Sequence, residues 1–392
     1  MTAQRVENYL KDQTGSDNPL VAEGFQNLMN LYVNKLWNQL SEESSRLVCN
    51  SEFVLAVNLS QFYEEFVRDF ERRIEPLQLI ELVTLIADNI FAKDRQRAFD
   101  FLNNFDNVVK QDKRAIVRLQ TSKIQLRLKD KPTPGASKCK DLPLVRKTLE
   151  ETKVLLNQLV DVGPVHAAYY CCSAEYQHQM GDHKLYYEEA LHYLGCEDIE
   201  GKLSAEQKSQ QAEKLSIAAL LGDNVYNFGE LLAHPILNVL SGSAKAWLNE
   251  ILNAVNAGDW NGFLKHKAKL VAEYSEAGQK IDALEQKLRL QCLIEMAHRL
   301  PAQRRDLNFG DIARVVRVDE DTVELLVMKA VANNLIDAKI DEPSRVVNVS
   351  WVQPRVLSTE QIRALASRTG DWCANIGSLK EELQLNTRDL TV

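Results

Sequence analysis

One stretch near the C-terminus constrains the fold most, because it carries the one clear β-strand signal in a chain whose other segments show helical spacing. In residues 336–340 and again in residues 347–351, apolar side chains alternate with polar ones. A period of two on both sides of the polar segment 341–344 predicts a β-hairpin. Because an isolated hairpin is only marginally stable in water, it must pack on the helical segments before it. A small group of helices capped by a hairpin is a winged helix.

Length and charge limit the classes of protein to consider. The chain has 392 residues, more than the roughly 250 to 300 at which single hydrophobic cores stop growing, so two or more substructures are expected. It carries 47 basic and 55 acidic side chains, a net charge of -8. A general nucleic-acid binder has the opposite balance.

Cysteine usage and hydropathy indicate the compartment. The chain has seven cysteines, an odd number without a paired framework, which favours a reduced intracellular protein. The first residues lack the basic and apolar regions of a secretory signal, and no apolar run approaches the ~20 residues that span a bilayer. We therefore expect a soluble protein of the cytoplasm and nucleus without membrane contact.

The first part of the chain has the spacing of successive helices. Residues 1 to about 20 are polar and predict a loose arm or one short helix, and apolar positions recur at helical spacing from Phe25 to Leu128. The polar, proline-bearing segment 129–143 indicates either a mobile loop or a boundary between subdomains. We expect an N-terminal α-helical solenoid over residues 1–165, with a loop at 129–143.

A weak repeat follows. Three Gly-Asp pairs, which begin at Gly181, Gly222 and Gly258, each follow an apolar helical stretch. Glycine can take the left-handed conformation that ends a helix, and Asp can cap the next one, so each pair predicts the tight turn of a helical hairpin. This spacing is typical of a right-handed α-solenoid of the tetratricopeptide (TPR) kind.

The repeats lead into the winged helix through one buried helix. We expect helical repeats over residues 166–280, a linking helix at 281–300 and a winged helix at 301–357. The linking helix is apolar on two faces, which is typical of a helix buried between two layers. The whole chain is thus predicted to be mainly α-helical.

The last segment, 358–392, predicts a helix with a coiled-coil seam. It opens with Ser358-Thr359-Glu360-Gln361, a capping-box pattern. Apolar positions and one threonine then recur at alternating steps of three and four. Such a seam either binds a partner or folds back on its own chain, and both alternatives remain open. The seam residues are Ile362, Leu365, Thr369, Trp372, Ile376, Leu379 and Leu383.

The sequence shows no recognisable catalytic constellation. It lacks the GxSxG, GxGxxG and HExxH motifs, and Gly195 to Lys202 departs from a phosphate loop in its glycine spacing. The cysteines and histidines between Cys171 and Cys196 are the best metal candidates, but they form no CxxC pair. We predict no catalytic residue, no cofactor and no metal.

The winged helix is a poor candidate for binding DNA. Its second helix is predicted at residues 319–333, and residues 311–342 carry eight acidic and four basic side chains, which repel phosphates. Leu325 and Met328 are apolar beyond the core stripe, which predicts either a protein partner or burial under the preceding helix. An outer strand of the hairpin could also pair with a neighbouring chain.

Five blocks of the sequence carry a resemblance to a known family. They are LYVNKLW (31–37), YYEEALHYLGC (186–196), LLGDNVYNFGELLAHPIL (220–237), VELLVMKA (323–330) and SWVQPRVL (350–357). A solenoid that runs into a winged helix is the plan of the PCI module, predicted here at residues 166–357. Over most of residues 25–375, the chain resembles a family of non-ATPase subunits in the lid of the 26S proteasome.

The resemblance implies a non-catalytic scaffold that supports ATP-dependent degradation of ubiquitylated proteins. It implies a hetero-oligomer, in which the winged helix and a C-terminal helix bundle bind other PCI subunits, with no DNA and no small-molecule substrate. The residues implied in the edge-forming sheet are Val346, Val347, Asn348, Val349, Ser350, Trp351 and Val352. The alternatives are a PCI subunit of another complex, such as the COP9 signalosome or a translation initiation factor, with RNA contact, or an enzyme that uses the Cys/His group.

Overall fold

The chain folds into two compact units, Met1–Lys202 and Leu203–Val392. Both units are mainly helical, and the strands that are described form one sheet in the second unit. None of the helices that the structure describes is long and apolar enough to cross a membrane. The boundary expected after residue 165 separates two groups of helical repeats rather than two compact units, and it stays a prediction. The computed structural model describes residues 2–14, 19–109, 112–130, 139, 141–159, 162–196, 204–300, 305–354, 356 and 359–387.

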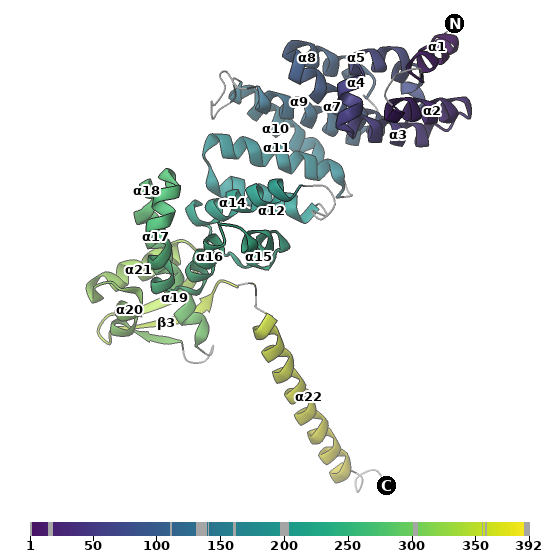
Figure 1. Ribbon diagram of the computed structural model, residues 1–392. Helices are drawn as coiled ribbons and strands as arrows, with labels where there is room; N and C mark the ends of the chain where they lie inside the picture. The colour runs from purple at the N-terminus through teal and green to yellow at the C-terminus, as the bar shows by residue number, and fades with distance from the viewer. Residues whose placement is uncertain are drawn as a thin grey trace. The chain divides into compact units, whose positions relative to one another are not determined.

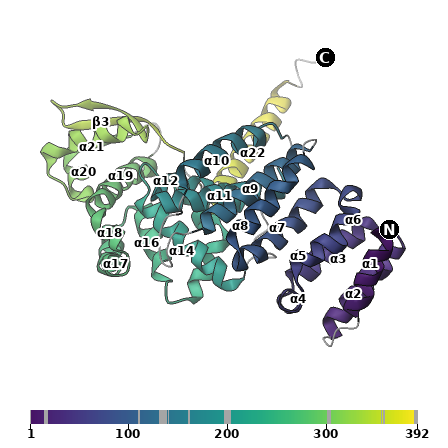
Figure 2. The same cartoon turned by 90° about the horizontal axis from the view of Figure 1, so that it is seen from above.

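The first unit consists of helices that pack against neighbours in the chain, as Figure 2 shows for α7 to α11. Residues 2–14, expected to form an arm or one short helix, form a helix with a buried apolar face. The elements are α1 (Thr2–Thr14), α2 (Pro19–Val33), α3 (Trp37–Cys49), α4 (Ser51–Ala56), α5 (Leu59–Phe62), the π-turn η1 (Tyr63–Val67), α6 (Arg68–Phe70), η2 (Glu71–Arg73), α7 (Pro76–Lys93), α8 (Arg95–Asn103), η3 (Asn104–Asn107), α9 (Lys113–Lys129), α10 (Leu142–Leu156), α11 (Pro164–Met180) and α12 (His183–Cys196).

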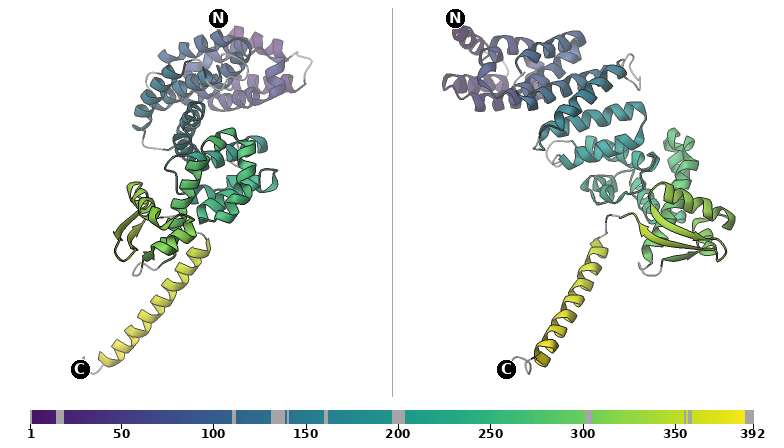
Figure 3. Two further views of the ribbon diagram at one scale, coloured as in Figure 1. Left: turned by 90° about the vertical axis from the view of Figure 1, so that its left-hand side faces the viewer. Right: turned by 180° about the vertical axis from the view of Figure 1, so that it is seen from behind.

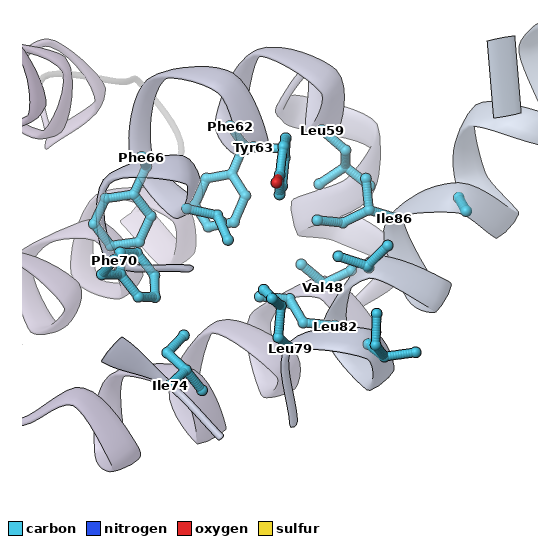
Figure 4. Packing of buried hydrophobic residues seen from close by; sticks show 14 of the residues in the cluster. Val48, Leu59, Phe62, Tyr63, Phe66, Phe70, Ile74, Leu79, Leu82 and Ile86 are labelled. Atoms are coloured by element: carbon cyan, nitrogen blue, oxygen red, sulfur yellow. The ribbon is translucent and has the colours of Figure 1, made fainter. Parts of the chain in front are cut away.

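Aromatic side chains make up much of the core of the first unit. Phe62, Phe66 and Phe70 recur every four residues from α5 to α6, and all three are fully buried. Their ring centroids are 5.3 Å apart for Phe62 and Phe66 and 5.0 Å apart for Phe66 and Phe70. Figure 4 shows them beside Leu79 and Leu82 of α7. Spacing of four residues places all three rings on one helical face, so the sequence pattern alone directs them inward.

The segment 129–143 joins two helices that share a core. Leu128, Cys139 and Val145 belong to one buried cluster. The buried side chain of Gln179 donates from Nε2 to the carbonyl oxygen of Leu128 at 3.2 Å, and its Oε1 accepts from the backbone nitrogen of Cys139 at 3.1 Å. These contacts favour a loop within one unit over a subdomain boundary. Residues 131–138 and 140 lie outside the described residues.

Two of the three predicted Gly-Asp turns are confirmed. Gly181 ends α11 with φ of 81°, and Gly258 ends α16 with φ of 67°. The prediction is wrong for Gly222, which has an extended backbone with φ of -67°. There the left-handed conformation falls on Asn224. The chain continues as a loop, and the carbonyl groups at the end of the preceding helix accept hydrogen bonds from Lys287 of another helix.

The second unit contains helical repeats, a linking helix and a winged helix, which confirms the predicted fold class. Figure 3 shows its strands beside α20 and α21. Ser204 and Gln207 form the predicted capping box at the start of α14. The elements are α14 (Ala205–Leu221), α15 (Gly229–Ala233), η4 (Pro235–Gly242), α16 (Trp247–Ala257), α17 (Trp260–Glu273), α18 (Ser275–Gln279), α19 (Ile281–Arg299), β1 (Asp306–Asn308), α20 (Phe309–Val316), α21 (Glu320–Ala332), β2 (Ile336–Asp341), β3 (Val346–Val352) and α22 (Thr359–Thr387).

Candidate subunit-interaction surfaces

The linking helix α19 carries a buried polar face that the sequence analysis missed. Its apolar faces are buried as predicted, but Lys287 is only 7% exposed. The Lys287 ammonium donates to the carbonyl oxygens of Ala219 at 2.6 Å, Leu220 at 3.2 Å and Gly222 at 3.0 Å. The last carbonyl groups of a helix have no partner within it, so Lys287 satisfies the end of α14.

The surroundings of Lys287 lower the pKa of its ammonium group. Burial lowers the pKa of Lys287 to about 7, and the carboxylate of Asp223 opposes this shift. The ammonium nitrogen also lies 5.0 Å from the centroid of the Phe228 ring, a cation–π contact. Lys287 is therefore held by neutral groups, namely carbonyl oxygens and an aromatic face.

Further polar contacts tie the winged helix to the repeats inside the second unit. Gln291 of α19 donates from Nε2 to the carbonyl oxygen of Tyr226, and Asn333 donates from Nδ2 to the Tyr226 hydroxyl at 3.2 Å. Arg317, in the turn after α20, donates from Nη2 to Oδ1 of Asn261 at 2.9 Å. The contacts of Asn333 and Arg317 therefore join the winged helix to the helices before it at two points, and Gln291 joins α19 to the same loop as Asn333.

Helix α21 presents an apolar and acidic outer face. Most of its predicted core side is buried, Val323 and Val327 fully, but the prediction is wrong for Val331, which is 36% exposed. Leu325 and Met328 are each 55% exposed, so the alternative that the preceding helix buries them is wrong. Glu324 is exposed next to Leu325. A face of this composition repels phosphates and offers apolar area to a protein.

The predicted hairpin is present, but it is part of a three-stranded sheet. Strands β2 and β3 pair antiparallel, and the missed strand β1 pairs with Val346–Asn348 of β3. The sequence analysis missed β1, because a strand of three residues is too short to show a period of two. The strand order is β1-β3-β2, so the outer edges of the sheet belong to β1 and β2.

Side chains on β3 divide between the core and the surface. The backbone hydrogen bonds of Val346–Asn348 are used within the sheet, and Val346 is half-buried. A bulge at Asp337 and Ala338 interrupts the register, and Trp351 is left 46% exposed. The core-facing residues are Val347, Val349 and Val352, and the exposed ones are Asn348, Ser350 and Trp351.

Helix α22 carries the predicted seam on an exposed surface. In Figure 1 it is one long helix, and its bounds are Thr359–Thr387. The large apolar seam residues are between 49% exposed, at Ile376, and 66% exposed, at Trp372. Thr369 is exposed as well. Of the predicted capping box, Ser358 lies outside the described residues.

The cysteines and histidines considered as metal ligands lie on α11 and α12. Cys172 is buried, and burial raises the pKa of its thiol. The ring centroid of His178 lies 5.4 Å from that of Tyr186, and that of His192 lies 5.2 Å from that of Tyr170. Within the ranges that the structure covers, no three His, Cys, Asp or Glu side chains are grouped so as to hold a metal ion.

Comparison with known proteins identifies the family. The model of the PSD13 N-terminal repeats matches residues 24–252, and the PCI domain model matches residues 259–351. The 26S proteasome non-ATPase regulatory subunit 13 of Dictyostelium discoideum is 30% identical over 376 residues, which is 95% of each chain. Homolog A of that subunit in Arabidopsis thaliana is 32% identical over 382 residues, 95% of this chain and 96% of its own. The chain belongs to the proteasome subunit 13 family.

Membership in the subunit 13 family confirms the resemblance seen in the sequence. The PCI match ends at residue 351, inside β3. Eukaryotic translation initiation factor 3 subunit M of Dictyostelium discoideum is 25% identical over 186 residues, 47% of this chain and 45% of that protein. The similarity to the subunit 13 family therefore extends over about twice as much of the chain.

Proposed function

We propose that this member of the subunit 13 family is a non-catalytic structural subunit of the 26S proteasome lid. It supports ATP-dependent degradation of ubiquitylated proteins by holding other PCI subunits together in a hetero-oligomer, in the cytoplasm and nucleus. Relatives named as regulatory, non-ATPase subunits support a role without catalysis. The module then spans residues 166–357, and 358–392 form the bundle helix and tail.

The exposed seam of α22 is the observation that carries this proposal. Its large apolar side chains are about half exposed or more, from Ile362 to Leu383. Burying one such side chain stabilises an assembly by roughly 1.5 to 3 kcal/mol. A heptad seam presents these side chains along one line, which is the geometry that a helical bundle requires. We infer that α22 packs into a bundle with helices of neighbouring subunits.

The winged helix offers a second contact. Strand β2 has the longer outer edge of the sheet, and Asp337, Lys339 and Asp341 alternate along it. Charged residues on an edge strand oppose pairing with unrelated strands, so a partner strand needs charges of the opposite sign at the facing positions. Leu325 and Met328 on α21 and Trp351 on β3 add exposed apolar surface. We infer that another PCI subunit pairs with this edge.

Co-purification from cells tests the proposal. A tagged full-length chain is isolated next to a seam variant, Leu365→Glu with Ile376→Glu, and a control variant, Ser367→Glu with Ala374→Glu. The control residues lie on α22 between the seam positions and are exposed, so both variants add the same charge to the same helix. We expect proteasome subunits with the wild type and the control, and a loss of about tenfold or more with the seam variant.

The outcomes test the proposed function and the proposed binding surface on α22 separately. Absence of proteasome subunits from the wild-type sample would refute the proposed function. If subunits are recovered equally with the seam variant and the control, membership in the lid stands, but the seam does not bind the partner.

A further inference from the structure

A hollow in the second unit lies where the repeats, the linking helix and the winged helix meet. Its volume is about 180 Å³. The loop after α14 forms one wall, α19 the floor and the end of α21 the other wall. The polar side chains that matter for its chemistry are Asp223, Tyr226, Lys280, Lys287, Lys329 and Asn333.

The lining has an excess of positive charge in a chain that is acidic overall. Three lysines line the hollow, against the one carboxylate of Asp223. Lys287 uses its three N–H groups on backbone carbonyls, so its charge meets no carboxylate at bonding distance. Neither Lys280 nor Lys329 forms an ion pair with any residue in the described ranges. Lys267 and Lys245 of the same unit, in contrast, pair with glutamates.

A neutral donor completes the lining. The Tyr226 hydroxyl accepts a hydrogen bond from Asn333, so its own proton remains available for a ligand. Burial raises the pKa of Tyr226, which keeps this proton in place at neutral pH. The hollow thus combines two ammonium groups with one hydroxyl donor.

We propose that this hollow binds a phosphate group, carried either by a free organic phosphate or by a phosphorylated side chain of a partner. The three lysines and Asp223 leave a net charge of +2 when Lys287 is protonated, and a phosphate dianion balances this charge whereas a single carboxylate does not. The volume of about 180 Å³ admits the group together with the first atoms attached to it. The site adds a ligand to a subunit proposed to act only as a scaffold.

Phosphate binding in the hollow would affect how the winged helix is held against the helices before it. The lining residues come from the loop after α14, from α19 and from α21. A phosphate that bridges Lys280 and Lys329 would connect α19 to the winged helix beside the contacts of Lys287 and Asn333. A ligand that binds only the folded state raises the unfolding temperature. The bridge between Lys280 and Lys329 would in addition restrain the orientation of the winged helix.

Isothermal titration calorimetry on the purified full-length chain tests this site, with pyrophosphate and a short phosphoserine peptide as probes. The site variant is Lys280→Ala with Lys329→Ala. The control, Lys93→Ala with Lys380→Ala, removes the same charge from exposed positions outside the hollow. A third variant, Tyr226→Phe, removes only the hydroxyl donor.

We expect the wild type to bind at least one probe with a rise in unfolding temperature. The site variant should bind about tenfold more weakly and Tyr226→Phe a few-fold more weakly, while the control stays within about twofold of wild type. Tighter binding of pyrophosphate would identify a free phosphate as the ligand, and tighter binding of the peptide a phosphorylated partner. Wild type that binds neither probe, or equal weakening in both double variants, would overturn the proposal.

Discussion

At the residue scale, Lys287 shows how a single side chain can join distant parts of a fold. It satisfies the end of a helix whose residues lie more than 60 positions away in the chain. In the sequence it is one of six charged residues in α19, and a charged residue on a helix is ordinarily expected in solvent. Its partners are backbone carbonyl groups, which leave no residue pattern to detect.

Replacing Lys287 by Met should lower the free energy of unfolding by about 2 kcal/mol at pH 7. The change leaves buried carbonyl groups without donors, which costs roughly 1 to 3 kcal/mol. The matched control is Gln286→Met, which introduces the same residue at an exposed position of α19, and we expect it to stay within about 0.5 kcal/mol of wild type. Chemical denaturation measures both, and equal values for the two variants would contradict the capping role.

The stability difference between wild type and Lys287→Met should also grow as the pH rises from 7 to 9. Burial lowers the pKa of Lys287 to about 7 in the folded chain, against about 10.4 when unfolded. Between these values the unfolded chain binds more protons, so wild-type stability increases with pH. Denaturation of both chains at several pH values measures this trend. A constant difference would mean that the carbonyl groups keep the ammonium charged throughout.

At the element scale, the sequence predicted the helix α22 but not the surroundings of that helix. The alternating steps of three and four predicted both the helix and its seam. Whether the seam folds back depends on surfaces elsewhere in the chain. Trp372, Ile376 and Leu379 are about half exposed or more, so the described residues of the second unit do not bury them.

Ending the chain after residue 357 should leave the remaining fold intact. The exposed seam side chains contribute little to any core of this chain, so the unfolding temperature should change by less than about 2 °C. Differential scanning calorimetry of the truncated and full-length chains checks this expectation. A clear fall in unfolding temperature would show that α22 packs against the rest of the chain. The truncated chain should also be poorly incorporated into the complex.

At the scale of the whole molecule, charge separates this winged helix from nucleic-acid readers. The chain has a net charge of -8, and the outer face of α21 carries acidic residues beside exposed Leu325 and Met328. Affinity for nucleic acids depends largely on cations that neutralise phosphates. The alternative function, a PCI subunit that contacts RNA, therefore has weak support from the winged helix.

The purified chain should show no salt-dependent binding to RNA or duplex DNA, with dissociation constants above about 100 μM at physiological salt. Fluorescence anisotropy between 50 and 200 mM salt measures this. A variant with Asp321→Lys and Glu324→Lys reverses charge on α21 and should bind more tightly at low salt. Wild-type binding that weakens as salt is added would favour the RNA-contacting alternative.

The local elements of this protein could be predicted from its sequence, because they depend on patterns within a few residues. Period two predicted β2 and β3, and the capping residues predicted the start of α14 and the ends of α11 and α16. The extended backbone at Gly222, the central place of β3 and the burial of Lys287 could be seen only in the folded chain. Each of these features depends on groups that are distant in sequence. A carbonyl oxygen or a strand edge is part of the backbone, so no residue pattern predicts its contacts.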